Sequence, residues 1–346
     1  MALQTSGSIS LSQIASEFND TAPHSLSEQY SAAPGIPSSG SISFSQFYGK
    51  SNSVAATGGA YVVTPGNGYK YHTFTGPGTF AVSNAGEVDI LVVAAGGGSA
   101  ELNDSRSGGA GGGGVAYWSS VSLPAQSYSI TVGSGVAEAN GGDSVFGPGT
   151  SYSVVAKGGG AGGGGPRGSQ VAASNGGSGG GGSGFDQNSN SGTATQPSQN
   201  PGRSGLINYG NDGGPNRAPF LGTATAEGGG GAGGAGNRTT ATYGATGGHG
   251  VQIASGAFAG SLIGIPSINP YSGYYGGGGD SSDSQNTTRP LGGGGACPHS
   301  SPVANHNGQA GVNYTGGGAS GGGTGGFTTI PGNAGGHGIV VVRYAV

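Results

Sequence analysis

The sequence is poor in the residues on which disulfide-rich, metal-dependent and nucleic-acid-binding proteins depend. Among 346 residues there is one cysteine, one methionine and one tryptophan, and charged residues make up 7%. A single cysteine excludes an intramolecular disulfide framework. The 10 lysines and arginines against 14 acidic residues give a net charge of −4, which excludes the basic surface that binds phosphate backbones. One methionine and one tryptophan leave little for an ordinary helical core.

Long apolar stretches are also missing. The longest aliphatic run, residues 90–95, is far shorter than the roughly 20 residues that span a bilayer. Residues 1–5 carry no basic region, and no apolar stretch follows them as in a secretory signal. We therefore expect a protein that is made in a cytoplasm without such export. It would work there, leave by lysis, or leave as part of a particle.

Glycine is the residue that the chain has in excess. It accounts for 85 of the 346 residues, against a usual share of roughly 7%. The glycines do not recur at every third position, which excludes collagen, and the low charge density excludes a charged disordered tail. They are concentrated in seven runs, at residues 108–114, 158–165, 176–184, 228–236, 276–279, 292–295 and 316–326.

The first fifty residues contain an internal repeat. GSISLSQI at 7–14 recurs as GSISFSQF at 40–47, and SLSE at 25–28 repeats its middle. Serine followed three residues later by Gln or Glu is a capping box, so three short helices are predicted to open near Ser10, Ser25 and Ser43. Such helices need tertiary contacts, and a module of this size is marginal alone.

We therefore expect residues 1–51 to form a separate module that either attaches to a partner or caps its own body. The apolar residues at helical spacing would make the attachment contacts. They are Leu11, Ile14, Phe18, Phe44, Phe47 and Tyr48.

A period of two replaces the helical pattern after residue 51. Strands are predicted at residues 69–75, 79–83, 87–95, 128–132 and 152–156. The segment 87–95 is the most apolar, which is typical of a central strand. The chain ends in the similar run 338–344, so the two are expected to lie near each other in one sheet. Residues 52–95 with 338–346 would then form a β platform.

Two interpretations of the glycine runs within residues 96–337 compete. Glycine tracts are usually flexible linkers. Alternatively, the runs are polyproline-II helices packed side by side, where each N–H reaches a neighbouring carbonyl only because no side chain intervenes. The number of runs and the short strands between them favour packing. The predicted fold is mainly β and irregular, with a small helical N-terminal module, a β platform and a glycine-rich bundle of packed polyproline-II helices with exposed loops.

The segments between the runs are rich in Asn, Ser, Gln, Pro and aromatic residues. They span residues 185–203, 206–220, 252–275 and 297–314. Loops of this composition on a rigid scaffold are typical of binding surfaces. Their aromatic residues are the candidate receptor contacts. For any one of them, packing over an end of the bundle is an equally good interpretation. They are Tyr209, Phe220, Phe258, Tyr271, Tyr274, Tyr275 and Tyr314.

Motifs for catalysis are weak. Residues 176–180 and 318–322 both match G-x-S-x-G, but such matches arise by chance in a glycine-rich chain and no strand–elbow–helix context accompanies them. No pair of carboxylates stands out as a glycosidase site. We expect a protein that is not an enzyme.

Motifs for metal binding are weak as well. Cys297, His299 and His306 do not have a common zinc spacing. Asp280 and Asp283 follow a glycine run but lack the nonapeptide pattern of calcium β-rolls. We expect neither a bound metal nor a cofactor.

Several of these segments resemble parts of bacteriophage proteins. GSISLSQIASEF and GSISFSQFYGKS are similar to the amino-terminal motif of tailed-bacteriophage tail-fibre and baseplate proteins. Four further segments resemble the glycine-rich domain of phage tail fibres and tip adhesins. They are YHTFTGPGTFAV from Tyr71, EVDILVVAAGGG from Glu87, SYSITVGSG from Ser127 and the terminal GGHGIVVVRYAV.

The resemblance implies a virion protein that is assembled in the host cytoplasm and attaches the phage to its host. The module at 1–51 would bind other tail or baseplate proteins, and the loops would bind a host surface glycan or an outer-membrane protein, without nucleic acid. Both a homotrimer and a monomeric tip fit. A structural tail or baseplate component that never touches a receptor is the alternative. An ice-binding protein would need Ala or Thr at every third position, which the runs lack.

Overall fold

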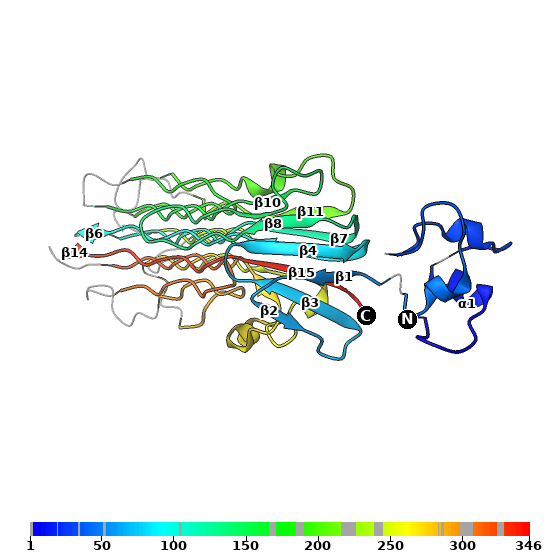
Figure 1. The fold of residues 1–346 in the computed structure, drawn as a ribbon. Coiled ribbons are helices and arrows are strands. Elements are labelled where there is room, and N and C mark those ends of the chain that lie inside the picture. The colour runs from blue at the N-terminus through cyan, green and yellow to red at the C-terminus, as the bar shows by residue number, and fades with distance from the viewer. Residues whose placement is uncertain are drawn as a thin grey trace.

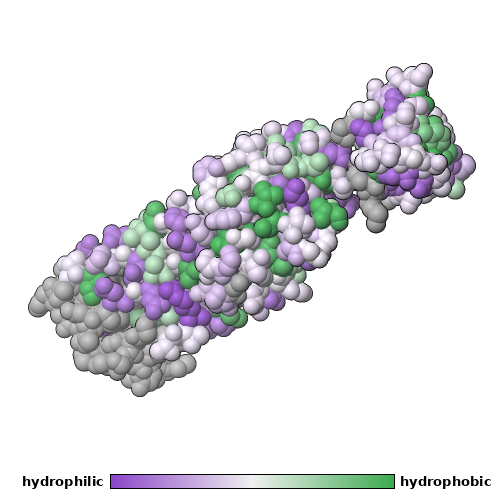
Figure 2. Space-filling model, turned by 60° about the horizontal axis from the view of Figure 1, so that its bottom comes forward, coloured by the Kyte–Doolittle hydropathy of each residue, from purple (hydrophilic) through white to green (hydrophobic). Residues whose placement is uncertain are grey.

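The protein is elongated, with its three parts arranged along one axis. The computed structural model describes residues 3–346 except 19, 34, 51–52, 104–105, 166–170, 185–189, 216–225, 239–244, 283, 285–286, 298–306 and 324–328. The N-terminal module lies at one end, the β-strands follow, and glycine-rich segments run to the other end (Figure 1). Figure 2 shows the same outline, with hydrophobic and hydrophilic residues interspersed over the face in view.

The N-terminal module contains the three predicted helices, each behind a capping box. They are α1 (Leu11–Glu17) and two 3₁₀ helices, η1 (Leu26–Gln29) and η2 (Phe44–Phe47). The caps are Ser10, Ser25 and Ser43, as the repeat predicts. Only α1 is an α-helix. The module has a small core of its own, formed by Leu3, Ile14, Ala33, Ile36 and Phe47.

Two antiparallel sheets follow the module. The first contains, in spatial order, β1 (Ala55–Thr57), β4 (Gly78–Asn84), β8 (Ser127–Thr131), β9 (Ser144–Phe146) and β10 (Val154–Ala156). The second contains β11 (Leu206–Tyr209), β7 (Val115–Leu123), β5 (Gly86–Val93), β15 (Ile339–Ala345), β3 (Tyr69–Phe74) and β2 (Tyr61–Val63). The prediction that the two most apolar segments lie near each other in one sheet is confirmed, and they pair directly, with Val340 of β15 opposite Val92 of β5.

Both faces of the second sheet are buried. On β5, Ile90 and Val92 face the first sheet, where they share a core with Phe80, Tyr128 and Phe146. The alternate residues, such as Leu91 and Val93, belong to a second core on the opposite face. Burial on both faces explains why β5 and β15 read as continuous apolar runs rather than alternating ones.

Short elements complete the fold. The remaining strand pairs are β6 (Leu102–Asn103) with β14 (Thr329–Ile330), and β12 (Val251–Gln252) with β13 (Tyr274–Tyr275). The remaining helices are η3 (Gln196–Ser198), η4 (Ala254–Gly256) and η5 (Pro266–Tyr271). β6 and β14 lie at the end of the molecule farthest from the module (Figure 1). Across the described ranges, no helix has the length and apolar character needed to cross a bilayer.

The glycine runs are hydrogen-bonded to one another with a period of three residues. The run 108–114 shows the pattern, because its N–H groups turn in sequence to three neighbouring segments. The first segment receives the N–H groups of Gly108, Gly111 and Gly114 on the carbonyls of Gly163, Gly160 and Lys157. The second receives those of Gly109 and Gly112 on Glu227 and Gly230. The third receives those of Ala110 and Gly113 on Ala319 and Gly316.

The carbonyls of the same run accept from three other segments. The Gly111 carbonyl accepts from the Gly97 N–H, and the Gly112 carbonyl accepts from the Ser178 N–H. The Ala110 carbonyl accepts from the Gly279 N–H. A Cβ added at Gly109 would overlap the carbonyl of Gly279, and one at Gly111 would overlap that of Ser178. The run is therefore enclosed by neighbouring backbone on all sides. The flexible-linker interpretation does not hold for it.

Candidate functional site

The segment 251–275 is a cover for the second sheet and not a free loop. Phe258 and Tyr275 are both completely buried, and they share the second core with Leu91 and Val341. This corrects the expectation that these two rings are receptor contacts, because a fully buried ring offers no surface to a partner. These two aromatic residues, which suggested a recognition loop, fill this core instead.

Two side chains of β3 fasten this segment to the sheet through its backbone carbonyls, and a third side chain ties the segment to itself. The Tyr71 hydroxyl donates to the Ala257 carbonyl at 3.0 Å, and the Thr73 hydroxyl donates to the Ile263 carbonyl at 2.8 Å. Within the segment, the Tyr275 hydroxyl donates to the Phe258 carbonyl at 2.6 Å. Complete burial raises the pKa of Tyr275 well above its ordinary value, so this donor keeps its proton.

A charged pair lies beneath the same segment. Arg343 Nε lies 2.9 Å from Asp89 Oδ2, and the two side chains are only 9% and 14% exposed. The guanidinium lies over the rings of Tyr69 and Phe258, at 4.3 Å and 4.8 Å from their centres. Burial alone would lower the pKa of Arg343, but the hydrogen bonds with Tyr71 and Asp89 outweigh it and raise that pKa. The guanidinium therefore stays charged, as a link between β5, β15 and the covering segment.

The other predicted receptor contacts are dispersed. Tyr209 on β11, Tyr271 at the end of η5 and Tyr314 are partly buried against the second core. Tyr274 in β13 is also partly exposed. Phe220 lies outside the described residues. Tyr271 and Tyr274 lie close together in the sequence of the covering segment 251–275, so they are the best candidates for a shared surface.

The candidate metal ligands are only partly described. The Cys297 thiol is buried and donates to the Ser282 carbonyl at 3.1 Å. Asp280 is buried, and its Oδ1 accepts from the Gly247 N–H at 2.8 Å. His299, His306 and Asp283 lie outside the described residues. Where side chains are described, no three His, Cys, Asp or Glu residues gather as metal ligands would.

The three helices of the N-terminal repeat bury their first and fourth residues to different extents. The fourth residue of each helix is buried, namely Ile14, Gln29 and Phe47. At the first position of the helices, Phe44 is 39% exposed and Leu11 is half-buried, whereas Leu26 packs against the core of the module. This corrects the expectation for Ile14 and Phe47, which are core residues, and leaves Leu11 and Phe44 accessible.

The two remaining attachment candidates stabilise the module. Phe18 is half-buried, and its ring meets that of Phe47 edge-to-face with 6.0 Å between centres. The Tyr48 hydroxyl donates to the Gly7 carbonyl and so ties the two copies of the repeat together. Neither ring is an exposed surface feature.

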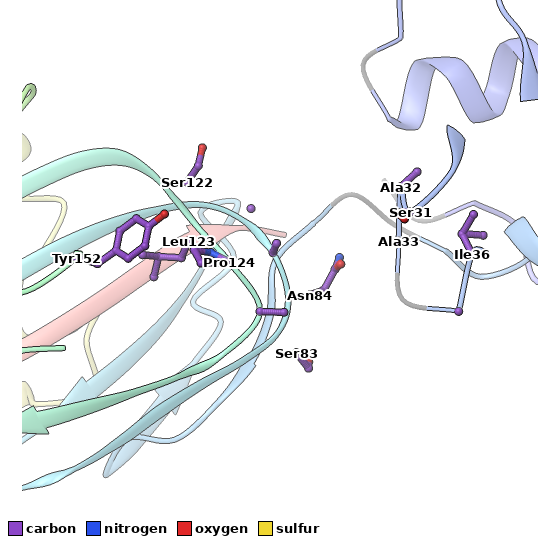
Figure 3. Close-up of a pocket in the computed structure, with 14 residues that line it drawn as sticks. Ser31, Ala32, Ala33, Ile36, Ser83, Asn84, Ser122, Leu123, Pro124 and Tyr152 are labelled. Atoms are coloured by element: carbon purple, nitrogen blue, oxygen red, sulfur yellow. The ribbon is translucent and has the colours of Figure 1, made fainter. Parts of the chain in front are cut away.

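A hollow between the module and the sheets is a further candidate surface, which the sequence does not reveal. Figure 3 shows Ala32 and Ile36 on the module side, and Leu123, Pro124 and Tyr152 on the sheet side. The turn at 83–86 completes its wall. Its lining is made of small, apolar and neutral polar residues without a charge, so the hollow suits an uncharged group.

The comparisons with known proteins agree with the glycine-based architecture. No curated protein matches the sequence. One family model, that of a glycine-rich domain, matches residues 72–345. This range begins within β3, ends with β15, and contains every glycine run described above. The chain therefore belongs to the glycine-rich domain family.

Proposed function

We propose that the protein is a non-enzymatic receptor-binding protein of a bacteriophage tail. The observation that carries the proposal is the arrangement in Figure 1, where a separately packed module at one end is followed by a long backbone-bonded scaffold. Such a scaffold holds surface segments in fixed positions at a distance from the attachment point. The resemblance of the terminal and repeat sequences to phage tail-fibre proteins supplies the biological setting.

We also propose that the glycine runs are polyproline-II helices. A hydrogen-bond pattern that returns to the same neighbour after three residues fits a helix with three residues per turn. None of the glycines in 108–114 has a positive φ, which agrees with that conformation. Ordering glycine is costly in entropy, and backbone hydrogen bonds worth roughly 1 kcal/mol each would offset the cost. The bundle would then be stiff enough to act as a rod.

The module at 1–51 is proposed to bind another tail protein. Leu11 and Phe44 are the support, because they occupy the same position in the two copies of the repeat and leave apolar surface uncovered on a very small module. A structural tail or baseplate component would use the same surface. Receptor binding therefore has to be tested separately from attachment.

Binding of the labelled full-length chain to candidate host cells tests the proposed function. Deleting 252–275 is not a usable control, because that segment fills a core. The double variant Tyr271→Ala/Tyr274→Ala is expected to weaken saturable binding, while Tyr61→Ala, at an exposed tyrosine on β2, leaves it unchanged. A folded chain that ignores every host of the phage would contradict receptor binding. Its recovery in purified virions would then favour the structural alternative.

A further inference from the structure

The turn between β2 and β3 carries an exposed Asn67–Gly68 pair. Gly68 has a φ of +82°, and no atom lies within 4 Å of the place where a Cβ would be. The Asn67 Oδ1 accepts from the Tyr69 N–H at 3.2 Å, so the side chain folds over the Gly68 peptide as an Asx turn. Within the part of the chain that the structure describes, the Gly68 N–H donates no hydrogen bond.

We propose that Asn67 is a site of spontaneous deamidation. The Gly68 nitrogen attacks Asn67 Cγ, and the Tyr69 N–H polarises the carbonyl that is attacked. The new N–C bond closes a succinimide ring, while the side-chain nitrogen leaves as ammonia with the proton from the Gly68 amide. Water then opens the ring at either carbonyl and yields aspartate or isoaspartate. The balance is one water consumed and one ammonia released, with no change of oxidation state.

Two of the three other Asn–Gly pairs, at 140–141 and 175–176, show how a packed backbone can prevent this reaction. The N–H of Gly141 donates to the Gly159 carbonyl at 2.9 Å, and that of Gly176 donates to the Thr193 carbonyl at 3.2 Å. Their asparagines, Asn140 and Asn175, accept backbone N–H groups from neighbouring segments. In both pairs the attacking nitrogen donates a hydrogen bond within the network of backbone hydrogen bonds that joins the glycine runs, which we call the glycine lattice. Ring closure would break that hydrogen bond. Asn67 has no such protection.

The reaction would change a contact beneath the covering segment 251–275. Asn67 Nδ2 donates to the Tyr71 hydroxyl at 2.9 Å, and that hydroxyl donates to the Ala257 carbonyl. A carboxylate has no N–H to donate and accepts hydrogen bonds strongly. The Tyr71 hydroxyl would therefore turn to the new carboxylate and release Ala257. Deamidation would loosen the covering segment from the sheet.

Peptide mapping of the full-length protein, aged in mildly alkaline buffer, tests the site. The Asn67 peptide is expected to gain the mass change of amide to acid and to contain isoaspartate, at a rate close to that of a synthetic peptide of the same sequence. Peptides with Asn140 and Asn175 serve as internal controls and are expected to stay unmodified. If Asn67 stays intact while the synthetic peptide converts, or if the three sites convert equally, the proposal is wrong.

The consequence is tested with variants that need no ageing. Asn67→Asp is expected to raise the hydrogen-exchange rate of amides in 251–275 several-fold. Asn313→Asp is the matched control, because the hydrogen bond given for the Asn313 side chain among the described residues is accepted from the His337 N–H, and an aspartate can accept it too. Equal exchange rates in both variants would show that Asn67 does not hold the segment through Tyr71.

Discussion

At the scale of single residues, the glycines of the lattice are required because neighbouring backbone leaves no room for a side chain. Gly109 faces the Gly279 carbonyl so closely that a methyl group has no room, and its neighbour is backbone that cannot rotate away. Overpacking of this kind usually costs 1–3 kcal/mol. We expect Gly109→Ala to lower the free energy of unfolding by at least about 2 kcal/mol. Gly76→Ala, where a Cβ meets nothing within 4 Å, is the control in denaturant unfolding. Equal stabilities of the two variants would contradict the close-packed lattice.

His72 predicts a pH dependence of stability. The ring is fully buried between the Gly58 carbonyl, at 2.7 Å from Nδ1, and the Tyr344 hydroxyl, at 3.0 Å from Nε2. Burial lowers its pKa below the ordinary value of 6.5, with Lys70 adding to the effect and the Gly58 hydrogen bond opposing it. Below pH 6.5 the His72 ring is therefore protonated more readily in the unfolded chain than in the folded chain. Stability is expected to be level above pH 6.5 and to fall below it.

Unfolding measured across this pH range in His72→Gln tests that origin. The variant loses the titrating ring, so the part of the decline that His72 causes should disappear, even if the variant is less stable throughout. His24→Gln, in the N-terminal module, should keep the full decline. An unchanged pH profile in His72→Gln would assign the effect to other groups.

At the scale of elements, the Arg343–Asp89 pair joins β15 to β5 beneath the covering segment. Removing one partner of a buried ion pair leaves an uncompensated charge and typically costs 3–5 kcal/mol. We expect Arg343→Met and Asp89→Asn each to lower the free energy of unfolding by about 3 kcal/mol. The double variant should lose clearly less than the sum, because neither charge is then stranded. Additive losses, measured by denaturant unfolding, would show that the pair does not act as a unit.

The same elements show what the sequence can and cannot predict. The apolar runs of β5 and β15 identify central strands without further information, and Ser10, Ser25 and Ser43 identify helix starts, because both signals are local. The role of Phe258 and Tyr275 is not local. Aromatic residues between glycine runs suit a recognition loop and a core equally well, and only the return of the chain over the second sheet decides between them. The hollow beside Tyr152 likewise depends on the placement of two distant segments.

At the scale of the whole molecule, the fold closes with its last strand. β15 lies between β5 and β3 in the middle of the second sheet, and its residues contribute to both cores. Every glycine run lies between β5 and β15 in the sequence, so the lattice is enclosed by contacts of very long sequence separation. Such contacts have to form against a large loop-closure entropy. The lattice is therefore expected to depend on β15.

Deleting residues 339–346 tests this dependence. The truncated chain is expected to lose the protease-resistant body that begins at β1, while the N-terminal module, which has a core of its own, stays folded because it shares no strand with β15. Deleting Val346 alone is the control, because that residue is 61% exposed and lies beyond the last strand. Limited proteolysis with mass mapping separates the two parts. A protease-resistant glycine-rich fragment without β15 would contradict this dependence. It would show that the lattice folds and remains stable without the complete second sheet.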